Sequence, residues 1–276
     1  MESIRQLYKI GHGPSSSHTM GPLKAALAFA GNDNAEGATA CTVTLYGSLA
    51  ATGKGHLTDK AILDALTPHF PTEIVWRPET VLPFHTNAMT FTATFADGRE
   101  PFSQTYYSVG GGDIVLDGQP RIPAKSIYPM NKIKDIQAWC ERTGKTYWEF
   151  VEENEGPEIW DYLAEVWRVM KAAVERGIEA EGVLPGGLGV RRKAVSYYVH
   201  AAGYSQSLKS RGLVYAYALA VSEENASGGE IVTAPTCGSC GIVPAVLYHL
   251  YTSKGFSERR ILRALATAGL FGNVVK

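Results

Sequence analysis

The sequence predicts an α+β protein, with an N-terminal α/β sheet domain over residues 1–150 and a mainly helical domain over residues 151–276. Two observations carry this prediction. Short segments of alternating or β-branched apolar residues occur in the first half. Apolar residues at helical spacing dominate the second half. A chain of 276 residues is long enough for two modest domains that each bury a core.

The first half mixes strand and helix patterns. An apolar helix is expected over residues 23–30, with Ser17 or Thr19 as its cap and Gly31 at its end. A short amphipathic helix is expected over residues 59–66. Alternation and β-branching predict strands at residues 41–46, 73–76, 89–95, 106–109 and 114–116. Asp97-Gly98 follows the third of these strands and predicts a hairpin turn.

The second half is expected to be built of helices. Pro157 and Gly177 bracket an apolar stripe at helical spacing, which predicts one long helix. Further helices are expected over residues 194–202, 212–222 and 242–250. A last helix is expected from Glu258, after a Ser257 cap, to Lys276.

Composition excludes several classes of function. The net charge is −1 with both signs dispersed, so a nucleic-acid partner is not expected. No apolar run approaches the roughly 20 residues that span a bilayer, so no membrane partner is expected. Four cysteines in a chain of this length do not make a disulfide scaffold, which favours a reducing, cytoplasmic setting.

Two of the cysteines form a Cys-x-x-Cys pair, Cys237 and Cys240, between small residues and an apolar helix. Backbone N–H groups and the positive helix end are expected to lower the thiol pKa and favour thiolate, the form that binds metal. A buried turn with small apolar cysteines is the structural alternative. No second ligand pair follows at zinc spacing, and no strand–motif–helix unit of thioredoxin type surrounds the pair. Cys41 and Cys140 are interpreted as structural.

Gly-Pro dipeptides flank a polar loop made of Ser15, Ser16, Ser17, His18 and Thr19 at a predicted helix start. Hydroxyl and backbone N–H donors gathered in this way can hold a carboxylate. An ordinary serine-rich helix cap is the structural alternative.

A second polar group lies between Gly47 and His56. It is not a phosphate loop, because the glycine spacing is wrong and Gly55 stands where a magnesium-binding Ser or Thr belongs. His85 and Asn87 precede a strand and are a candidate for substrate contact, with a structural turn as the alternative. The other histidines carry no motif.

Jointly, these motifs resemble the iron–sulfur-dependent L-serine dehydratases (L-serine ammonia-lyases), with their beta and alpha parts fused. The resemblance covers nearly the whole chain, in the order of the family. It is carried by residues 13–22, 45–56, 184–187, 223–226 and 233–247.

The resemblance implies a [4Fe–4S] cluster that acts as a Lewis acid on L-serine. Cys240 matches a cysteine of the family motif, whereas Cys237 stands where an Asn is common; both are metal candidates. Such a cluster needs at least three thiolates. The family's remaining cluster cysteines belong to segments beyond this match, so the chain is expected to be a fragment, or half of a two-chain enzyme, inactive alone.

The resemblance also implies roles for the polar groups. His56 or His18 would remove the α-proton of L-serine. The substrate would be bound by Ser15, Ser16, Ser17, Thr19, His85 and Asn87. The full-length enzyme is expected to be a homo-oligomer.

Other classes of function remain open on the sequence. Pyridoxal phosphate would be another electron sink, but no lysine and phosphate-cup combination stands out. The first half could be an amino-acid-binding module that senses serine without turnover. The Cys-x-x-Cys pair could belong to a thiol redox protein.

Overall fold

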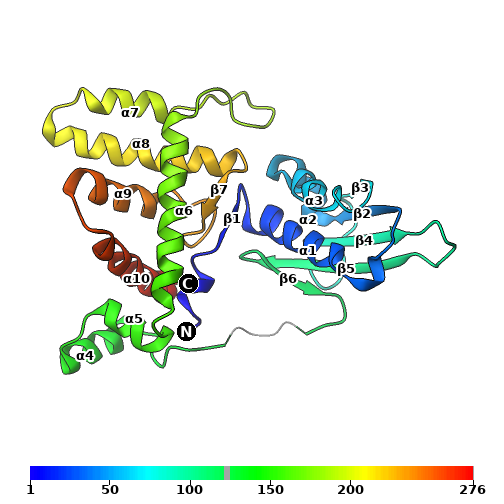
Figure 1. The fold of residues 1–276 in the computed structure, drawn as a ribbon, viewed down its shortest axis with the longest axis horizontal. Helices are drawn as coiled ribbons and strands as arrows, with labels where there is room; N and C mark the ends of the chain where they lie inside the picture. Colours follow the sequence, from blue (N-terminus) through cyan, green and yellow to red (C-terminus); the bar gives the residue numbers. More distant parts are fainter. Residues whose placement is uncertain (121–124, 276) are drawn as a thin grey trace. The chain divides into compact units, whose positions relative to one another are not determined.

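The computed structural model describes residues 1–120 and 125–275, so Lys276, the expected end of the last helix, lies outside the described residues. The chain forms two compact units, His12–Ile122 and Met1–Gly11 with Pro123–Lys276. The first unit is built on a sheet and the second is mainly helical (Figure 1), which confirms the predicted α+β class. The domain division at residue 150 stays a prediction, since the compact units have different bounds.

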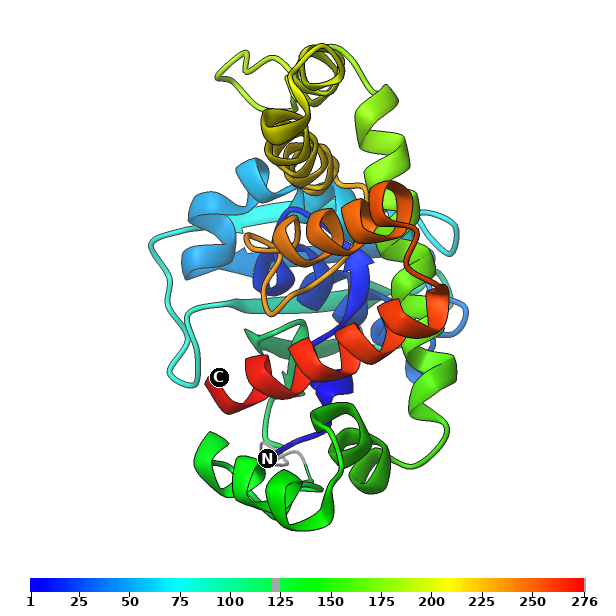
Figure 2. The ribbon, with the colours of Figure 1, turned by 90° about the vertical axis from the view of Figure 1, so that its left-hand side faces the viewer.

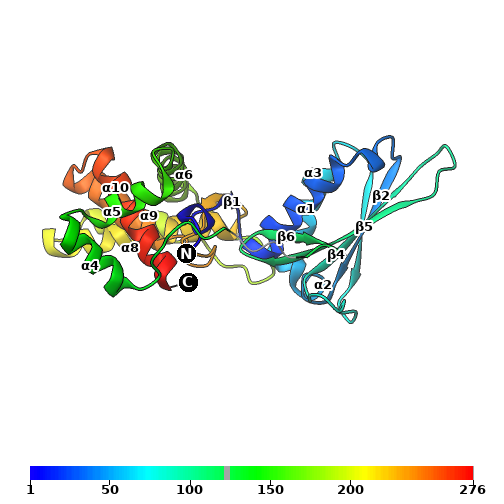
Figure 3. The ribbon, with the colours of Figure 1, turned by 90° about the horizontal axis from the view of Figure 1, so that it is seen from below.

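The sheet unit contains five strands in the order β3-β2-β4-β5-β6, with only β2 and β3 parallel. The strands are β2 (Ala40–Tyr46), β3 (Thr72–Arg77), β4 (Ala88–Thr94), β5 (Phe102–Gly110) and β6 (Asp113–Leu116). The helices are η2 (Ser16–Met20), α1 (Gly21–Ala30), η3 (Asp33–Ala35), α2 (Gly47–Thr52), η4 (Gly53–His56) and α3 (Thr58–Leu66). Helices α1 and α3 lie on the same face of the sheet (Figure 3).

Alternation along the strands explains this arrangement. In β2 and β4, alternate side chains such as Val43 and Phe91 are fully buried under the helices. Phe29 of α1 stacks on Phe91 with ring centroids 5.2 Å apart. On the opposite face, threonines pair across strands, with 2.7 Å between the hydroxyl oxygens of Thr90 and Thr105. The predicted strands and hairpin are confirmed.

The helical unit is organised around α6, against which α8, α9 and α10 pack (Figures 1 and 2). Its elements are η1 (Ile4–Gln6), β1 (Ile10–His12), α4 (Ile133–Thr143), α5 (Tyr147–Glu155), α6 (Ile159–Glu179), α7 (Ala194–Ala202), α8 (Gln206–Ala226), β7 (Glu230–Val232), α9 (Ile242–Lys254) and α10 (Glu258–Val275). Trp167 of α6 is fully buried in its core. A Cβ on Gly177 of α6 would lie 2.4 Å from the Ala220 carbonyl oxygen of α8, so these helices cross at backbone distance.

The first residues of the chain belong to the helical unit. The Tyr8 hydroxyl donates to the Leu265 carbonyl of α10 at 3.0 Å. The Asn273 amide donates to the Glu2 carbonyl at 2.6 Å. Strand β1 pairs with β7 in a two-stranded sheet. The N-terminus is therefore held by elements from the far end of the sequence.

Two local predictions need correction. Neither Ser17 nor Thr19 caps α1; Ser15 caps the single π turn η2, and α1 continues directly from Met20 without a side-chain cap. Helix α8 is also longer than the predicted 212–222, because it carries on through polar residues at both ends. Among the described residues, no helix is both long and apolar enough to cross a membrane.

Candidate active site

Hydrogen bonds within the polar loop of residues 15–19 hold it in one conformation. The Ser15 hydroxyl oxygen accepts from the His18 backbone N–H at 3.2 Å. The Ser15 N–H donates to the Thr19 hydroxyl oxygen at 3.2 Å. That hydroxyl in turn donates to the His56 carbonyl at 2.7 Å, and Thr19 is only 3 % exposed. Thr19 therefore holds the loop against the segment that carries His56.

This contact brings two predicted catalytic histidines together. The ring centroids of His18 and His56 are 4.7 Å apart, with 34° between the ring planes. The Thr58 hydroxyl donates to the His18 carbonyl, which adds a second link between the two segments. Each histidine is half-buried. The sequence separates the two residues widely, and the fold joins them.

The His56 ring has a defined hydrogen-bond partner. Its Nδ1 lies 3.0 Å from the Thr52 carbonyl oxygen. Because a carbonyl only accepts, Nδ1 carries the hydrogen, and in the neutral ring Nε2 keeps its lone pair. In the neutral His56 ring, Nε2 is thus the atom that can take a proton.

The His18 ring is held by the start of α2. Its Nε2 lies 3.0 Å from the Ser48 hydroxyl oxygen. Burial lowers the pKa of His18, and the neighbouring His56 lowers it further, while a hydrogen bond to the Ser48 backbone acts in the opposite direction. The lowered pKa favours the neutral imidazole at neutral pH.

Ser16 and Ser17 are half-buried, and their hydroxyls have no hydrogen-bond partner in the part of the chain that the structure describes. They lie in the same turn as His18. Two hydroxyls next to an imidazole can donate to a carboxylate. Their predicted role in substrate binding remains open to test.

The segment around His85 and Asn87 joins the same cluster through Thr86. The Ser48 N–H donates to the Thr86 carbonyl oxygen at 3.2 Å. Gly47 has a φ of +47°, and a Cβ there would lie 2.6 Å from the same oxygen, so a glycine is needed at this approach. The Asn87 N–H donates to His85 Nδ1 at 3.0 Å. Asn87 itself is 8 % exposed and turned towards the Ser108 carbonyl.

Ser48 is the member of this cluster to which the sequence interpretation assigned no role. It connects the His18 ring to the Thr86 backbone. The available signal was its place just after β2, because polar residues that follow the carboxyl end of a strand often face a site.

The cysteine pair lies in the helical unit, in the loop before α9. Cys237 is 3 % exposed and Cys240 is 1 % exposed. Burial raises the pKa of Cys237 to about 11 and that of Cys240 to about 12. The prediction that the helix start lowers the thiol pKa is therefore wrong, because desolvation of the thiolate outweighs the helix end.

A [4Fe–4S] cluster is not completed by these residues. None of Cys41, Cys140, Cys237 and Cys240 forms a disulfide. Over residues 1–120 and 125–275, no three His, Cys, Asp or Glu side chains are grouped as metal ligands would be. The cluster needs at least three thiolates. This chain by itself does not fit the group, and the metal roles of Cys237 and Cys240 stay predictions.

Glu223 and Glu224, in the segment 223–226 that carries part of the family resemblance, make structural contacts. The Glu224 carboxylate, 10 % exposed, accepts from Arg176 at 3.1 Å and from Arg192 at 3.0 Å. The adjacent Glu223 accepts from the Lys193 N–H at 2.6 Å, next to the start of α7. These contacts fasten the segment that follows the exposed loop of residues 184–187 to α6 and α8.

Comparison with known proteins agrees with the motifs. The family model for the serine dehydratase beta chain matches residues 3–74, and the family model for the serine dehydratase alpha chain matches residues 84–276. The L-serine dehydratase of Streptomyces coelicolor is 37% identical, with 99% of this chain and 71% of the relative covered. L-serine dehydratase 2 of Escherichia coli is 35% identical, with 100% and 72% covered.

The L-serine dehydratase of Haemophilus influenzae is 36% identical over 330 aligned positions, with 100% of this chain and 72% of the relative covered. These alignments are longer than the 276 residues of this chain, so the relatives carry additional residues within the matched range. The resemblance deduced from the motifs is confirmed over the whole chain. This polypeptide, with its beta-type and alpha-type parts joined, belongs to the serine dehydratase family of enzymes.

Proposed function

We propose that this protein converts L-serine to pyruvate and ammonia. The relatives that match over the whole chain are named L-serine dehydratases. The observation that carries the proposal to particular residues is the contact of two imidazoles, His18 of the hydroxyl-rich loop and His56 of η4. A base next to hydroxyl donors suits a substrate that has both an acidic α-proton and a carboxylate.

The polar residues around His18 and His56 would have the following roles in the reaction. Hydroxyls of Ser15, Ser16 and Ser17 hold the carboxylate, with the His85–Asn87 segment as a further contact. His56 takes the α-proton at Nε2, and His18 is the alternative base. Loss of the proton and of the β-hydroxide leaves an enamine, which becomes an imine. Water hydrolyses the imine to pyruvate and ammonia.

The cofactor belongs to the proposal. A [4Fe–4S] cluster, when bound, would supply a Lewis acid for the departing hydroxyl. We propose Cys240 as a thiolate ligand, with Cys237 beside it as a second candidate; the described residues supply no third, so the steps above are written without the cluster. We propose a cytoplasmic setting, because four cysteines in a chain of this length do not make a disulfide scaffold. A homo-oligomer of the full-length enzyme stays a prediction.

The decisive experiment measures pyruvate formed from L-serine by the chain prepared anaerobically with iron and sulfide. It is run with the chain alone and with the unmatched remainder of the Streptomyces coelicolor relative supplied as a second polypeptide. Turnover in either preparation supports the proposal. Absence of turnover in both, with a cluster demonstrated by its absorption, contradicts it.

An amino-acid-binding module is the second candidate, because the polar cluster lies wholly within one compact unit. Calorimetric titration of L-serine into iron-free protein separates the two. Binding without turnover in any preparation favours the module. The thiol redox alternative is disfavoured by the raised pKa of Cys237 and Cys240.

A further inference from the structure

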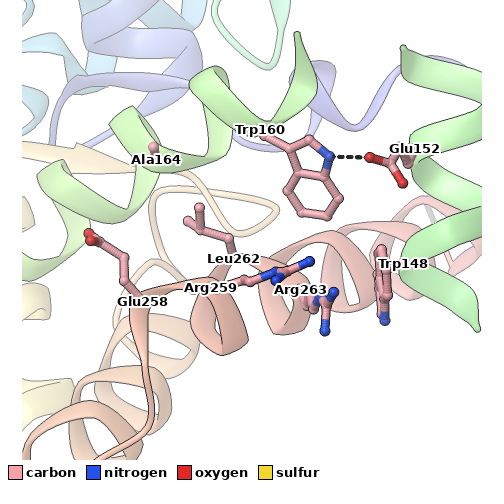
Figure 4. Close-up of a pocket in the computed structure, with 8 residues that line it drawn as sticks. All are labelled: Trp148, Glu152, Trp160, Ala164, Glu258, Arg259, Leu262 and Arg263. Carbon is pink, nitrogen blue, oxygen red and sulfur yellow. Dashed lines mark hydrogen bonds between the residues drawn. The ribbon is translucent and has the colours of Figure 1, made fainter. Parts of the chain in front are cut away.

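The helical unit contains a cavity of about 580 Å³ between α5, α6 and α10 (Figure 4). Its size falls within the roughly 300–1,000 Å³ of small-molecule sites. None of its lining residues belongs to the cysteine loop or to the polar cluster of the sheet unit. The functions considered above leave it unused.

Two indoles form an aromatic wall. The rings of Trp148 and Trp160 meet edge to face, with centroids 5.9 Å apart. The Trp160 Nε1–H donates to a Glu152 carboxylate oxygen at 2.7 Å, which fixes the indole (Figure 4). Leu262 and Ala164 add apolar surface. A planar ring is the shape that such a wall accommodates best.

Two arginines, Arg259 and Arg263, and two glutamates, Glu152 and Glu258, line the cavity. Arg263 lies over the Trp148 ring at 4.0 Å and also attracts the Glu149 carboxylate. The Arg259 guanidinium has neither an ion pair nor a hydrogen bond to any residue that the structure describes. In Figure 4 its guanidinium extends towards the indoles, whereas Glu258 lies on the far side of the cavity. Glu152 is engaged by Trp160. Arg259 therefore offers a guanidinium without an ion-pair partner among the described residues, beside an aromatic wall.

We propose that this cavity binds a small aromatic carboxylate. The ring of the ligand packs against Trp148 and Trp160, and its carboxylate takes two hydrogen bonds from the Arg259 guanidinium. Aliphatic L-serine lacks the ring, so this ligand differs in class from the proposed substrate. The site would remain if the dehydratase proposal failed, because it shares no residue with the histidine cluster.

The test follows tryptophan fluorescence of the full chain during titration with 3-phenylpropionate, which does not absorb at the excitation wavelength of indole. Two control compounds each keep one half of this ligand. Propionate has the carboxylate without the ring, and 3-phenylpropanol has the ring without the carboxylate. 3-Phenylpropionate is expected to bind saturably and at least about tenfold more tightly than either half, since a charge-assisted hydrogen bond contributes about 1.5–3 kcal/mol.

Arg259→Gln should weaken the binding of 3-phenylpropionate by at least about tenfold. The matched control is Arg260→Gln, because Arg260 is the next residue of α10, lies over Phe256 and does not line the cavity. Both arginines are exposed, so both variants are expected to fold. Lack of saturable binding at millimolar concentration, equal binding of 3-phenylpropanol, or equal effects of the two variants would each overturn the proposal.

Discussion

The imidazoles of His18 and His56 lie 4.7 Å apart, and each is fixed by a different partner. His56 donates from Nδ1 to a backbone carbonyl, and His18 meets the Ser48 hydroxyl through Nε2. Burial and the neighbouring His56 both lower the pKa of His18, which favours the neutral His18 imidazole.

His56→Gln should lower kcat for pyruvate formation by at least about 10²-fold, because a positioned general base contributes about that much. The expectation applies to the preparation that turns over L-serine. His69→Gln is the matched control, since His69 is exposed and lies outside the cluster. An unchanged kcat in the His56 variant, with native circular dichroism, would remove His56 from the mechanism.

Stability should depend on pH through His18. Its folded pKa lies below the ordinary value of 6.5, so the unfolded chain binds the proton more readily. The stabilising effect of the neutral ring is complete above pH 6.5 and is lost as the pH falls towards the folded pKa. Urea unfolding of wild type and His18→Gln should show a shallower decline below pH 6.5 in the variant. Parallel curves would contradict this.

The buried thiols should resist alkylation. Cys237 and Cys240 have pKa values of about 11 and about 12, so little thiolate exists at pH 8. Cys140 is more exposed and serves as the internal reference. Iodoacetamide labelling followed by peptide mass spectrometry should modify Cys140 first, and the pair only after denaturant is added. Rapid labelling of Cys237 or Cys240 in the native chain would show that the loop opens.

Single substitutions of Cys237 and Cys240 should show which of the two cysteines binds the iron–sulfur cluster. In the reconstituted preparation, Cys240→Ser should lose the iron absorption, whereas Cys237→Asn should retain it, because only Cys240 matches the family cysteine. Iron content by a colorimetric assay provides a second readout. The reverse pattern would exchange the roles, and loss in both variants would make the two cysteines joint ligands.

Glu224→Gln should destabilise the helical unit by about 1–3 kcal/mol, because it leaves Arg176 and the largely buried Arg192 without their carboxylate. Glu165→Gln, which breaks an exposed pair with Arg168 on α6, is the control and should cause no measurable change. Denaturant unfolding measures both. Equal effects of the two variants would show that burial of Glu224 does not matter.

Periodicity is a local property, and it predicted much of the fold. Alternation at β2 and β4, the apolar stripe of α6 and the glycine after α1 were readable because each depends on neighbours a few residues away. His18, His56 and the serines of the polar loop were also named from their motifs. Their types suited the chemistry before any geometry was known.

Contacts between distant segments were decided only by the tertiary structure. The link from His18 through Ser48 to the backbone of Thr86 depends on where α2 meets β4, which no local pattern encodes. The bond from Tyr8 to Leu265 likewise needs the whole helical unit in place. The thiol pKa of Cys240 was predicted in the wrong direction for the same reason. A helix start is visible in sequence, but desolvation comes from residues that only folding brings around the sulfur.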